Sequence, residues 1–240
     1  MRNDPGVDAQ KRAAAEAAVA QIEDGMILGL GTGSTALLAL DALAKRVRQG
    51  LRVTGVPTSE RIAARARELN IALTTLNDHA HLDLDVDGAD EVERGSLNLI
   101  KGKGGALLRE KIVAAASKRF IVIADQSKLV DRLGEKTAIP IEVARFGWKA
   151  TAGKLEALGG RPVLRLNADG SEFLSDGGNF ILDCSFGLIA DSPALARELD
   201  SIVGLMEHGL FLGMASVAII GEADGVSTHE LHAPGPIMKT

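Results

Sequence analysis

The spacing of apolar residues in the first half of the chain alternates between strand and helix patterns. Short apolar runs closed by glycine or a polar residue predict buried strands, and longer stretches with apolar residues every three or four positions predict helices. The predicted strands cover residues 26–30, 52–56, 71–76, 82–86 and 120–124. The predicted helices cover residues 8–23, 34–47, 59–69 and 106–117. Strands that alternate with helices in this way favour a parallel sheet with helices on both faces.

The pattern changes after about Leu133. Strand patterns follow at 139–144, 162–166, 179–183 and 205–207, with helical patterns at 149–158 and 193–202. The order strand–helix–strand–strand–helix–strand is typical of a ferredoxin-like unit. An apolar run at 215–221 predicts a strand that rejoins the first sheet, and no element is predicted after Glu222.

The expected fold class is therefore α/β, with a Rossmann-like open parallel sheet domain plus a smaller ferredoxin-like α+β domain. The first domain is predicted to comprise residues 1–133 and 208–240, and the second to comprise residues 134–207.

Composition narrows the classes of protein and partner. The chain has 240 residues, of which 46% are hydrophobic and 25% charged, as in ordinary globular proteins. A net charge of −5 argues against a nucleic-acid partner. The single cysteine, Cys184, excludes an intrachain disulfide and favours a reducing compartment. No leader-like segment or membrane-spanning run of roughly 18 apolar residues occurs, so we expect a cytoplasmic protein without a membrane partner.

A glycine-rich loop, GLGTGSTA at Gly29–Ala36, follows the first predicted strand and opens the next helix. A helix N-terminus presents unpaired N–H groups and the positive end of the helix dipole, and glycines let the backbone approach a ligand closely. The hydroxyl groups of Thr32, Ser34 and Thr35 add donors. The loop therefore favours a bound phosphate over the alternative, an ordinary strand-to-helix turn in which Ser34 caps the helix.

Two nucleotide-binding interpretations fit less well. The residues 31–36 match G-x-G-x-x-A, but a dinucleotide site requires an acidic residue about 20 positions later. The stretch 53–59 at that place contains no acid, so NAD is disfavoured, and no Walker A motif occurs. The sequence VPTS at 56–59 instead adds hydroxyl groups at the same edge of the sheet.

The net charge hides a division between neighbouring segments. Residues 76–100 contain seven acids and one base, whereas residues 101–136 contain nine bases and four acids. Most of these charges are expected on the solvated surface. Asp87 and Asp90 are different, because they follow an apolar strand and so lie at its carboxyl end, where open α/β sheets bind ligands.

A second glycine-rich loop, KGKGG at Lys101–Gly105, runs into a helix that contains Glu110. Apolar neighbours there would raise the pKa of Glu110 by desolvation, which suits a general base, although an exposed glutamate paired with a nearby base fits the sequence equally well. Lys128 follows the strand FIVIA and could hold a phosphate, although a surface lysine is the simpler interpretation. A phosphate anchor, a carboxylate base and a lysine that stabilises an oxyanion suit proton transfer beside a carbonyl, as in aldose–ketose isomerisation of a sugar phosphate.

At these residues the chain resembles type A ribose-5-phosphate isomerase. The resembling segments are GLGTGST (29–35), VPTS (56–59), DVDGADEV (85–92), LIKGKGGALLREKIV (99–113), FIVIADQSKLV (120–130), GGNFILDC (177–184) and EHGLFLGMA (207–215). The resemblance implies interconversion of D-ribose 5-phosphate and D-ribulose 5-phosphate through an enediolate, in the non-oxidative branch of the pentose phosphate pathway. It also implies no metal or organic cofactor, and a homodimer or homotetramer with oligomer contacts on the smaller domain.

The resemblance also implies roles for individual residues. Glu110 would move the proton between C2 and C1, and Lys101 would stabilise the enediolate oxygen. Asp87 and Asp90 would bind hydroxyl groups and assist ring opening. The substrate-binding residues would be Thr32, Gly33, Ser34, Thr35, Asp87, Gly88, Ala89, Asp90, Lys101, Gly102, Lys103, Gly104 and Lys128. Lys103 stands where many members carry glycine, so its role is left open.

Other functions and sites were weighed against the isomerase. A sugar-phosphate sensor would need a DNA-binding helix-turn-helix, yet only one short helix precedes the first strand. An acyl or CoA transferase would use a glutamate nucleophile and a larger acceptor pocket, and it stays open. The histidines near 79–81 and 229–232 lack a full set of metal ligands, so no metal site is expected. His208 is expected to be a packing or subunit-contact residue rather than a catalyst, and Cys184 a core residue.

Overall fold

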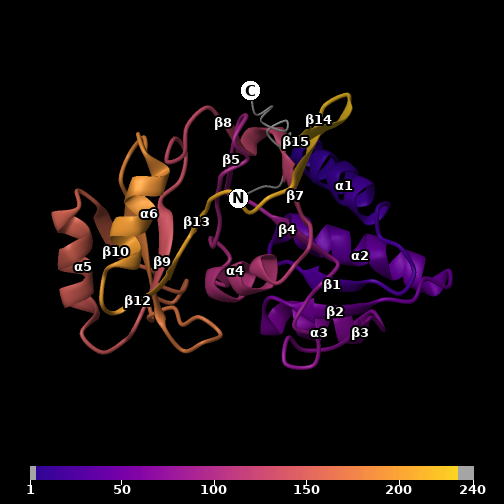
Figure 1. Ribbon diagram of the computed structural model, residues 1–240, viewed down its shortest axis with the longest axis horizontal. Coiled ribbons are helices and arrows are strands. Elements are labelled where there is room, and N and C mark those ends of the chain that lie inside the picture. The colour runs from indigo at the N-terminus through magenta and orange to yellow at the C-terminus, as the bar shows by residue number, and fades with distance from the viewer. Residues whose placement is uncertain (1–3, 232–240) are drawn as a thin grey trace, which may run out of the picture.

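The structure is a computed structural model that describes residues 4–231. Its largest sheet has seven strands in the order β15-β14-β7-β4-β1-β2-β3, all parallel except β15 (Figure 1). The strands are β1 (Ile27–Leu30), β2 (Thr54–Pro57), β3 (Ala72–Leu73), β4 (Leu84–Gly88), β7 (Phe120–Asp125), β14 (Val217–Glu222) and β15 (Gly225–Glu230). The central strands are buried on both faces, which explains their nearly continuous apolar sequences.

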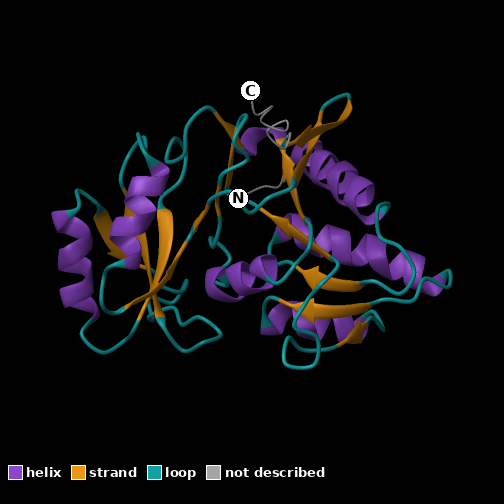
Figure 2. Cartoon of the chain, in the orientation of Figure 1, coloured by secondary structure: helices purple, strands orange, loops and turns teal. Residues whose placement is uncertain are grey.

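Four helices flank this sheet (Figure 2). They are α1 (Pro5–Val19), α2 (Ser34–Arg48), α3 (Glu60–Glu68) and α4 (Leu107–Ala115). Leu28 and Leu84 of the sheet pack with α1 and α2 in one large apolar cluster. The next residues along both strands, Gly29 and Asp85, lie on the opposite face, which α4 covers. This alternation places the polar residues of β1 and β4 between the sheet and α4.

A second unit forms the other lobe of the molecule (Figure 1). It comprises β9 (Ile139–Val143), α5 (Trp148–Ala157), β10 (Arg161–Leu164), β11 (Phe180–Ser185), α6 (Ser192–Asp200) and β12 (Leu205–His208). Its sheet is antiparallel in the order β10-β11-β9-β12, as a ferredoxin-like unit requires. Trp148 packs edge-on against Phe180 with 6.2 Å between the ring centroids, and Cys184 is fully buried in the core. The predicted fold class is confirmed, whereas the boundaries at 133/134 and 207/208 stay predictions.

A third, small sheet joins the two units and was not predicted. Its strands are β5 (Glu91–Glu93), β6 (Leu99–Ile100), β8 (Leu129–Val130) and β13 (Leu210–Phe211), in the order β13-β6-β5-β8. A short 3₁₀ turn at Gln126–Lys128 leads into β8. Strands of two or three residues are too short to show a hydrophobic period, which is why the sequence pattern missed them.

Three further predictions differ from the structure. The expectation of no element after Glu222 was wrong for residues 225–230, because β15 pairs with β14 as an exposed edge strand whose outward side chains are polar. Helix α1 begins at Pro5 rather than residue 8, since the Asp4 side chain accepts a hydrogen bond from the Gly6 N–H at 2.9 Å. The strand predicted at 71–76 is reduced to two residues at the edge of the sheet.

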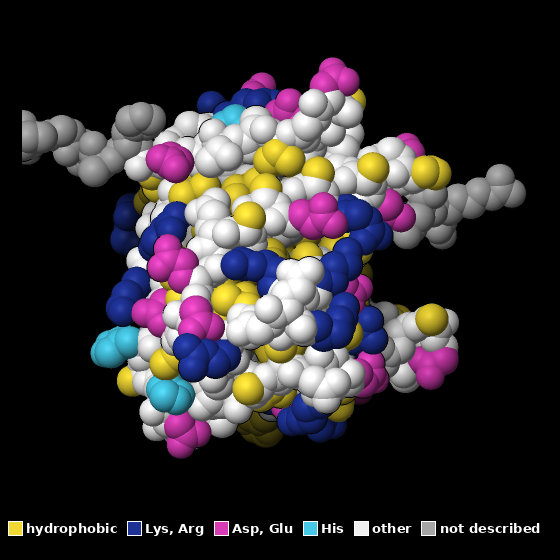
Figure 3. Space-filling view, turned by 90° about the vertical axis from the view of Figure 1, so that its right-hand side faces the viewer, with side chains coloured by type: hydrophobic (Ala, Val, Ile, Leu, Met, Phe, Trp, Pro, Cys, Tyr) yellow, Lys and Arg dark blue, Asp and Glu magenta, His cyan; other side chains and the backbone are white. Residues whose placement is uncertain are grey.

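The surface opposite the ferredoxin-like unit carries both signs of charge. Figure 3 shows Lys and Arg interspersed with Asp and Glu over this face. Some charged side chains of the large-sheet domain form ion pairs, as Arg65 does with Asp41 at 2.7 Å and Lys118 with Asp83 at 2.8 Å. None of the helices in residues 4–231 combines the length and apolar character that crossing a bilayer requires.

Glu91 of β5 is a buried carboxylate that ties the two units together. Its oxygens accept backbone N–H bonds from Gly134 at 2.7 Å, Lys136 at 2.6 Å and Thr137 at 2.7 Å. These residues begin the crossing from the small sheet to β9. Three amide donors satisfy the buried carboxylate and fix the path of the connection.

We therefore expect Glu91→Ala to lower the free energy of unfolding by about 3 kcal/mol, because three buried amides lose their acceptor. Urea denaturation measures the change. The matched control is Glu172→Ala, which removes an exposed glutamate and should change the free energy by less than about 0.5 kcal/mol. Equal losses in both variants would show that Glu91 is not a structural anchor.

Candidate active site

A pocket of about 290 Å³ opens at the carboxyl ends of the parallel strands. Every residue predicted for the site lines it except Asp87, which is fully buried behind the wall. The predicted residues on the wall are Thr32, Gly33, Ser34, Thr35, Gly88, Ala89, Asp90, Lys101, Gly102, Lys103, Gly104, Glu110 and Lys128. Lys11 and Arg61 also line the pocket and were not predicted. The four cations on the wall besides Lys101 suit an anionic ligand.

The N-terminus of α2 faces the pocket without a side-chain cap. Gly33 is the N-cap residue and has φ +134°, a conformation that disfavours a side chain. Ser34 is the first helical residue, so the alternative in which Ser34 caps the helix is wrong. Lys11 of α1 donates to the Ser34 hydroxyl at 3.4 Å. Free helix N–H groups, a hydroxyl and an ammonium group thus gather at one end of the pocket.

The hydroxyl groups of the neighbouring loops brace the pocket from behind. Thr32 donates to the Ser59 hydroxyl at 2.8 Å and lies 2.7 Å from the Thr58 hydroxyl, which itself donates to the Leu30 carbonyl at 2.9 Å. Ser59 also caps α3 by accepting from Ile62 N–H. The VPTS hydroxyls thus lie at the predicted edge but bind protein groups, because they are turned away from the pocket.

Gly29 and Gly31 of β1 make room for two carboxyl groups of β4. A side chain at Gly29 would collide with the Asp85 carboxyl group, and one at Gly31 with that of Asp87. These glycines were expected to let the backbone approach a bound phosphate closely. Their observed role is to leave space for buried aspartates, and of the three glycines only Gly33 lines the pocket.

Lys101 lies at the centre of a buried charged cluster. Its Nζ donates to Asp87 Oδ2 at 2.8 Å and to the Gly88 carbonyl at 2.6 Å, and it lies 3.3 Å from Glu110 Oε2. The three side chains are at most 2% exposed. Burial alone would lower the pKa of Lys101, but Asp87 and Glu110 raise it above its ordinary value. The lysine is therefore a fixed cation.

Asp87 is the partner that neutralises Lys101. Burial raises the pKa of Asp87, while attraction to Lys101 opposes that rise. Asp87 also accepts N–H bonds from Thr32 at 2.9 Å and from Gly88 at 2.7 Å. With three donors directed at its carboxyl group, Asp87 is the member of the cluster best suited to carry a negative charge.

Glu110 projects from the first turn of α4 into the same cluster and is 2% exposed. The pKa of Glu110 is raised to about 8. Burial is the main cause, repulsion from Asp87 and Asp90 adds to it, and attraction to Lys101 opposes it. Its Oε2 is close to Lys101 but accepts no well-aligned hydrogen bond from the described residues. Of the two alternatives for Glu110, a buried base and an exposed glutamate paired with a nearby base, the structure shows the buried one. Its carboxyl group can exchange a proton near neutral pH.

Asp85 is a further member of the cluster that the sequence analysis did not single out. It is fully buried against Gly29 and Val113, and neither carboxyl oxygen has a hydrogen-bond partner within residues 4–231. Burial raises the pKa of Asp85 well above its ordinary value, and repulsion from Asp87 adds to the effect. The Asp85 carboxyl group therefore holds its proton more tightly than an exposed aspartate does. Its position two residues before Asp87 in the same predicted strand region, and therefore on the same face, was the available signal.

Comparison with known proteins identifies the family. A family profile described as ribose 5-phosphate isomerase A (phosphoriboisomerase A) matches residues 54–225. A ribose-5-phosphate isomerase A from a Synechococcus strain is 54% identical over 222 residues, covering 92% of this chain and 96% of the relative. The chain belongs to the ribose 5-phosphate isomerase A family. A relative of the same name from a Roseiflexus strain is 56% identical and covers 93% of this chain and 96% of its own.

Solved structures of the family share the fold. Ribose 5-phosphate isomerase A from Methanocaldococcus jannaschii is 40% identical with a TM-score of 0.88, covering 92% of this chain and 98% of its own. Another D-ribose-5-phosphate isomerase, in complex with phospho-erythronic acid, is 39% identical with a TM-score of 0.90, covering 93% and 99%.

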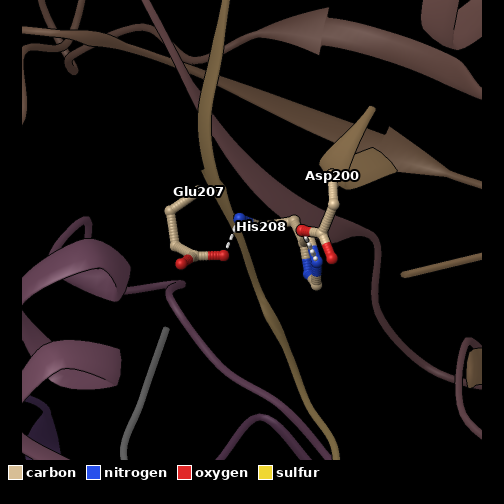
Figure 4. A group of neighbouring side chains, drawn as sticks. All are labelled: Asp200, Glu207 and His208. Carbon is tan, nitrogen blue, oxygen red and sulfur yellow. Dashed lines mark hydrogen bonds and ion pairs between the residues drawn. The ribbon is translucent and has the colours of Figure 1, made fainter. Parts of the chain in front are cut away.

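Figure 4 shows a second cluster of titratable groups, Asp200, Glu207 and His208, none of which lines the pocket. The Leu210 N–H donates to His208 Nδ1 at 3.2 Å, so Nε2 carries the proton and faces Asp200 Oδ1 at 3.1 Å. Lys111 of α4 donates to Glu207 Oε1 at 2.6 Å and to the His208 carbonyl at 2.7 Å. With the ammonium group of Lys111 already there, this cluster is a tie between α4 and β12, in which His208 is buried.

The raised pKa of Asp85 makes the stability of the protein depend on pH. Because its pKa is raised in the folded protein, the folded state keeps a proton that the unfolded state releases above its ordinary pKa, so stability falls as pH rises. Asp85→Asn removes this loss. The stability of Asp85→Asn relative to the natural protein, measured by urea denaturation, should therefore be higher at about pH 8 than at about pH 4.

Asp83 provides a control of opposite sign. A hydrogen bond from the Ile27 N–H and another from Lys118 lower the pKa of Asp83. Asp83→Asn should therefore lose stability relative to the natural protein as pH rises. An Asp85→Asn difference that does not grow with pH would show that Asp85 is ionised in the folded protein.

Proposed function

We propose that this protein interconverts D-ribose 5-phosphate and D-ribulose 5-phosphate through an enediolate. The observation that carries the proposal is the buried Glu110, with a pKa of about 8, beside the fixed cation Lys101 on the wall of a small pocket. Proton transfer beside a carbonyl requires a base and an oxyanion-stabilising cation that both reach the same ligand. The names of the relatives, and the sugar-acid phosphate bound to one of them, support the substrate class.

The phosphate of the substrate is proposed to bind at the N-terminus of α2. The N–H groups and hydroxyls of Ser34 and Thr35 are available there, and Lys11 and Lys128 supply positive charge. A dianion gains from both the helix dipole and the ammonium groups. This end of the pocket would hold the phosphate while C1 and C2 reach Glu110 and Lys101.

The proton is proposed to pass from C2 to Glu110 and back to C1. Removing it from C2 of the open-chain aldose makes an enediolate whose oxygen lies near Lys101, which stabilises the charge. Return of the proton to C1, with transfer of the C2 hydroxyl proton to the C1 oxygen, gives the ketose. Asp90 lines the pocket and is proposed to bind hydroxyls and assist ring opening. Asp87 does not line it, so we propose that it acts by holding Lys101.

Two other functions are less well supported. A sugar-phosphate sensor has no need of a base with a pKa of about 8 on its pocket wall. A CoA transferase needs space for a large acceptor, and a pocket of about 290 Å³ is small for that purpose.

Assembly, pathway and location are also proposals. We propose a homodimer or homotetramer that works in the cytoplasm, in the non-oxidative branch of the pentose phosphate pathway. Phe146 and Val203 of the ferredoxin-like unit are 98% and 80% exposed, which supports oligomer contacts on that unit.

Glu110→Gln should lower kcat by about 10³-fold, because an amide cannot take the C2 proton. Binding of ribose 5-phosphate, measured by calorimetry, should weaken by less than about threefold, since the glutamine keeps the shape of the pocket. The assay uses EDTA-treated protein, and Glu156→Gln on the exposed face of α5 is the control.

The outcomes separate the alternatives. Full activity of Glu110→Gln would overturn the assignment of the base. Tight binding of ribose 5-phosphate by the natural protein without any turnover would favour the sensor.

A further inference from the structure

A hairpin of the ferredoxin-like unit reaches across to the wall of the pocket. It connects β10 to β11 and is seen as the orange loop that extends toward α4 in Figure 1. At its start, the guanidinium group of Arg165 binds the Asp183 carboxylate with Nε and Nη2. Its Nη1 donates to the carbonyl oxygens of Gly102 and Lys103, both at 3.1 Å. Arg165 itself does not line the pocket.

The contact determines which way two peptide groups point. In a trans peptide the C=O and the following N–H point in opposite directions, and the described chain has no cis peptides. With both carbonyls turned toward Arg165, the N–H groups of Lys103 and Gly104 must point to the other side. The Lys103 N–H does so, donating to Asp90 Oδ2 at 2.9 Å. The Gly104 N–H has no acceptor within residues 4–231, and Gly104 lines the pocket.

The loop has few internal contacts to hold this orientation. Its internal backbone hydrogen bond runs from the Gly105 N–H to the Gly102 carbonyl at 2.9 Å. Gly102 and Gly105 have φ values of +105° and +82°, which leave the backbone free to adopt other conformations. The Phe173 ring of the same hairpin packs on Gly105 so closely that any side chain there would collide with it. The Arg165 guanidinium lies 5.7 Å from the centre of that ring.

We propose that Arg165 is a positioning residue for the isomerase reaction: it holds the Gly102 and Lys103 carbonyls away from the pocket, so that the Gly104 N–H and Asp90 face the sugar. The proposal rests on the function proposed above. Arginine suits this role because its planar fork serves Asp183 on one side and two carbonyls on the other. A lysine would present a single ammonium nitrogen in place of the three nitrogens that serve Asp183 and the two carbonyls here. Through Arg165, the ferredoxin-like unit thereby influences the geometry of the pocket, although Arg165 itself does not line it.

The decisive variant is Arg165→Met, which keeps the length of the side chain and removes its donors. We expect kcat/KM for ribose 5-phosphate to fall by about 30-fold, as expected when groups around a substrate are displaced. Phospho-erythronic acid, whose sugar-acid part is proposed to lie beside the loop when its phosphate is at the α2 N-terminus, should bind about tenfold more weakly. The inhibition constant of inorganic phosphate for Arg165→Met should stay within about twofold of its value for the natural protein, because the α2 N-terminus has no contact with Arg165.

Three companion variants complete the experiment. Arg165→Lys should give an intermediate loss, and Asp183→Asn should give a smaller loss with the same contrast between the two ligands, which preserves the test if Arg165→Met does not fold. Arg161→Met, which replaces an exposed arginine at the start of β10, should leave kcat/KM unchanged. Equal weakening of inorganic phosphate and phospho-erythronic acid would reveal a general loss of structure and overturn the proposal. So would an unchanged kcat/KM in Arg165→Met.

Failure of this proposal is distinguishable from failure of the proposed function. If the natural protein does not interconvert the pentose phosphates, the function itself is wrong. If the natural protein is active and Arg165→Met is equally active, only the role of Arg165 is wrong.

Discussion

The ammonium group of Lys101, buried between Asp87 and Glu110, is the constraint on which the rest of the site depends. A buried cation is tolerable only when it is paired and its hydrogen-bond donors are used. Asp87 and the Gly88 carbonyl meet this need, and both belong to the end of β4. Asp87 in turn fits only because Gly31 has no side chain. The end of β1, the end of β4 and the loop of Lys101 are thus fixed relative to one another by one charge.

Burial raises the pKa of Glu110 on α4, and the charge of Lys101 opposes that rise, which leaves a glutamate that can act as a base near neutral pH. The cluster contains one lysine and three buried carboxyl groups, so one cation cannot neutralise all of them. Asp87 has the donors, and Asp85 has none within the described residues. Glu110 lies between these cases, near Lys101 but without an aligned hydrogen bond, and its pKa settles at about 8. Burial raises the pKa of all three carboxyl groups, and the groups differ in how strongly hydrogen bonds and Lys101 oppose that rise.

Local sequence patterns predicted the fold wherever an element was long enough to show a period. The buried strands β1, β4 and β7 and the ferredoxin-like order were found in this way, whereas the strands of the small sheet were too short. Open α/β sheets bind ligands at the carboxyl ends of their strands, and this rule depends on strand direction alone. It predicted that Asp90, Lys101 and Glu110 lie together. The role of Gly29 and Gly31 could not be predicted, since it depends on which residues of β4 lie opposite them.

Other site residues gave no local signal. Lys11 lies in a helix that precedes the first strand, and Arg61 is one of several arginines on α3. Arg165 meets the loop of residues 102–103 only after two units have packed together. Such contacts join segments far apart in the sequence, so neither spacing nor composition reveals them.

The central claim is that the Lys101 cluster leaves Glu110 with a strongly raised pKa. The most direct measurement is an NMR titration of the side-chain carboxyl carbon of Glu110 in the unliganded protein, assigned by its absence in Glu110→Gln. A titration midpoint of about 8 is the predicted result. A midpoint near the ordinary value of 4.5 would contradict the claim.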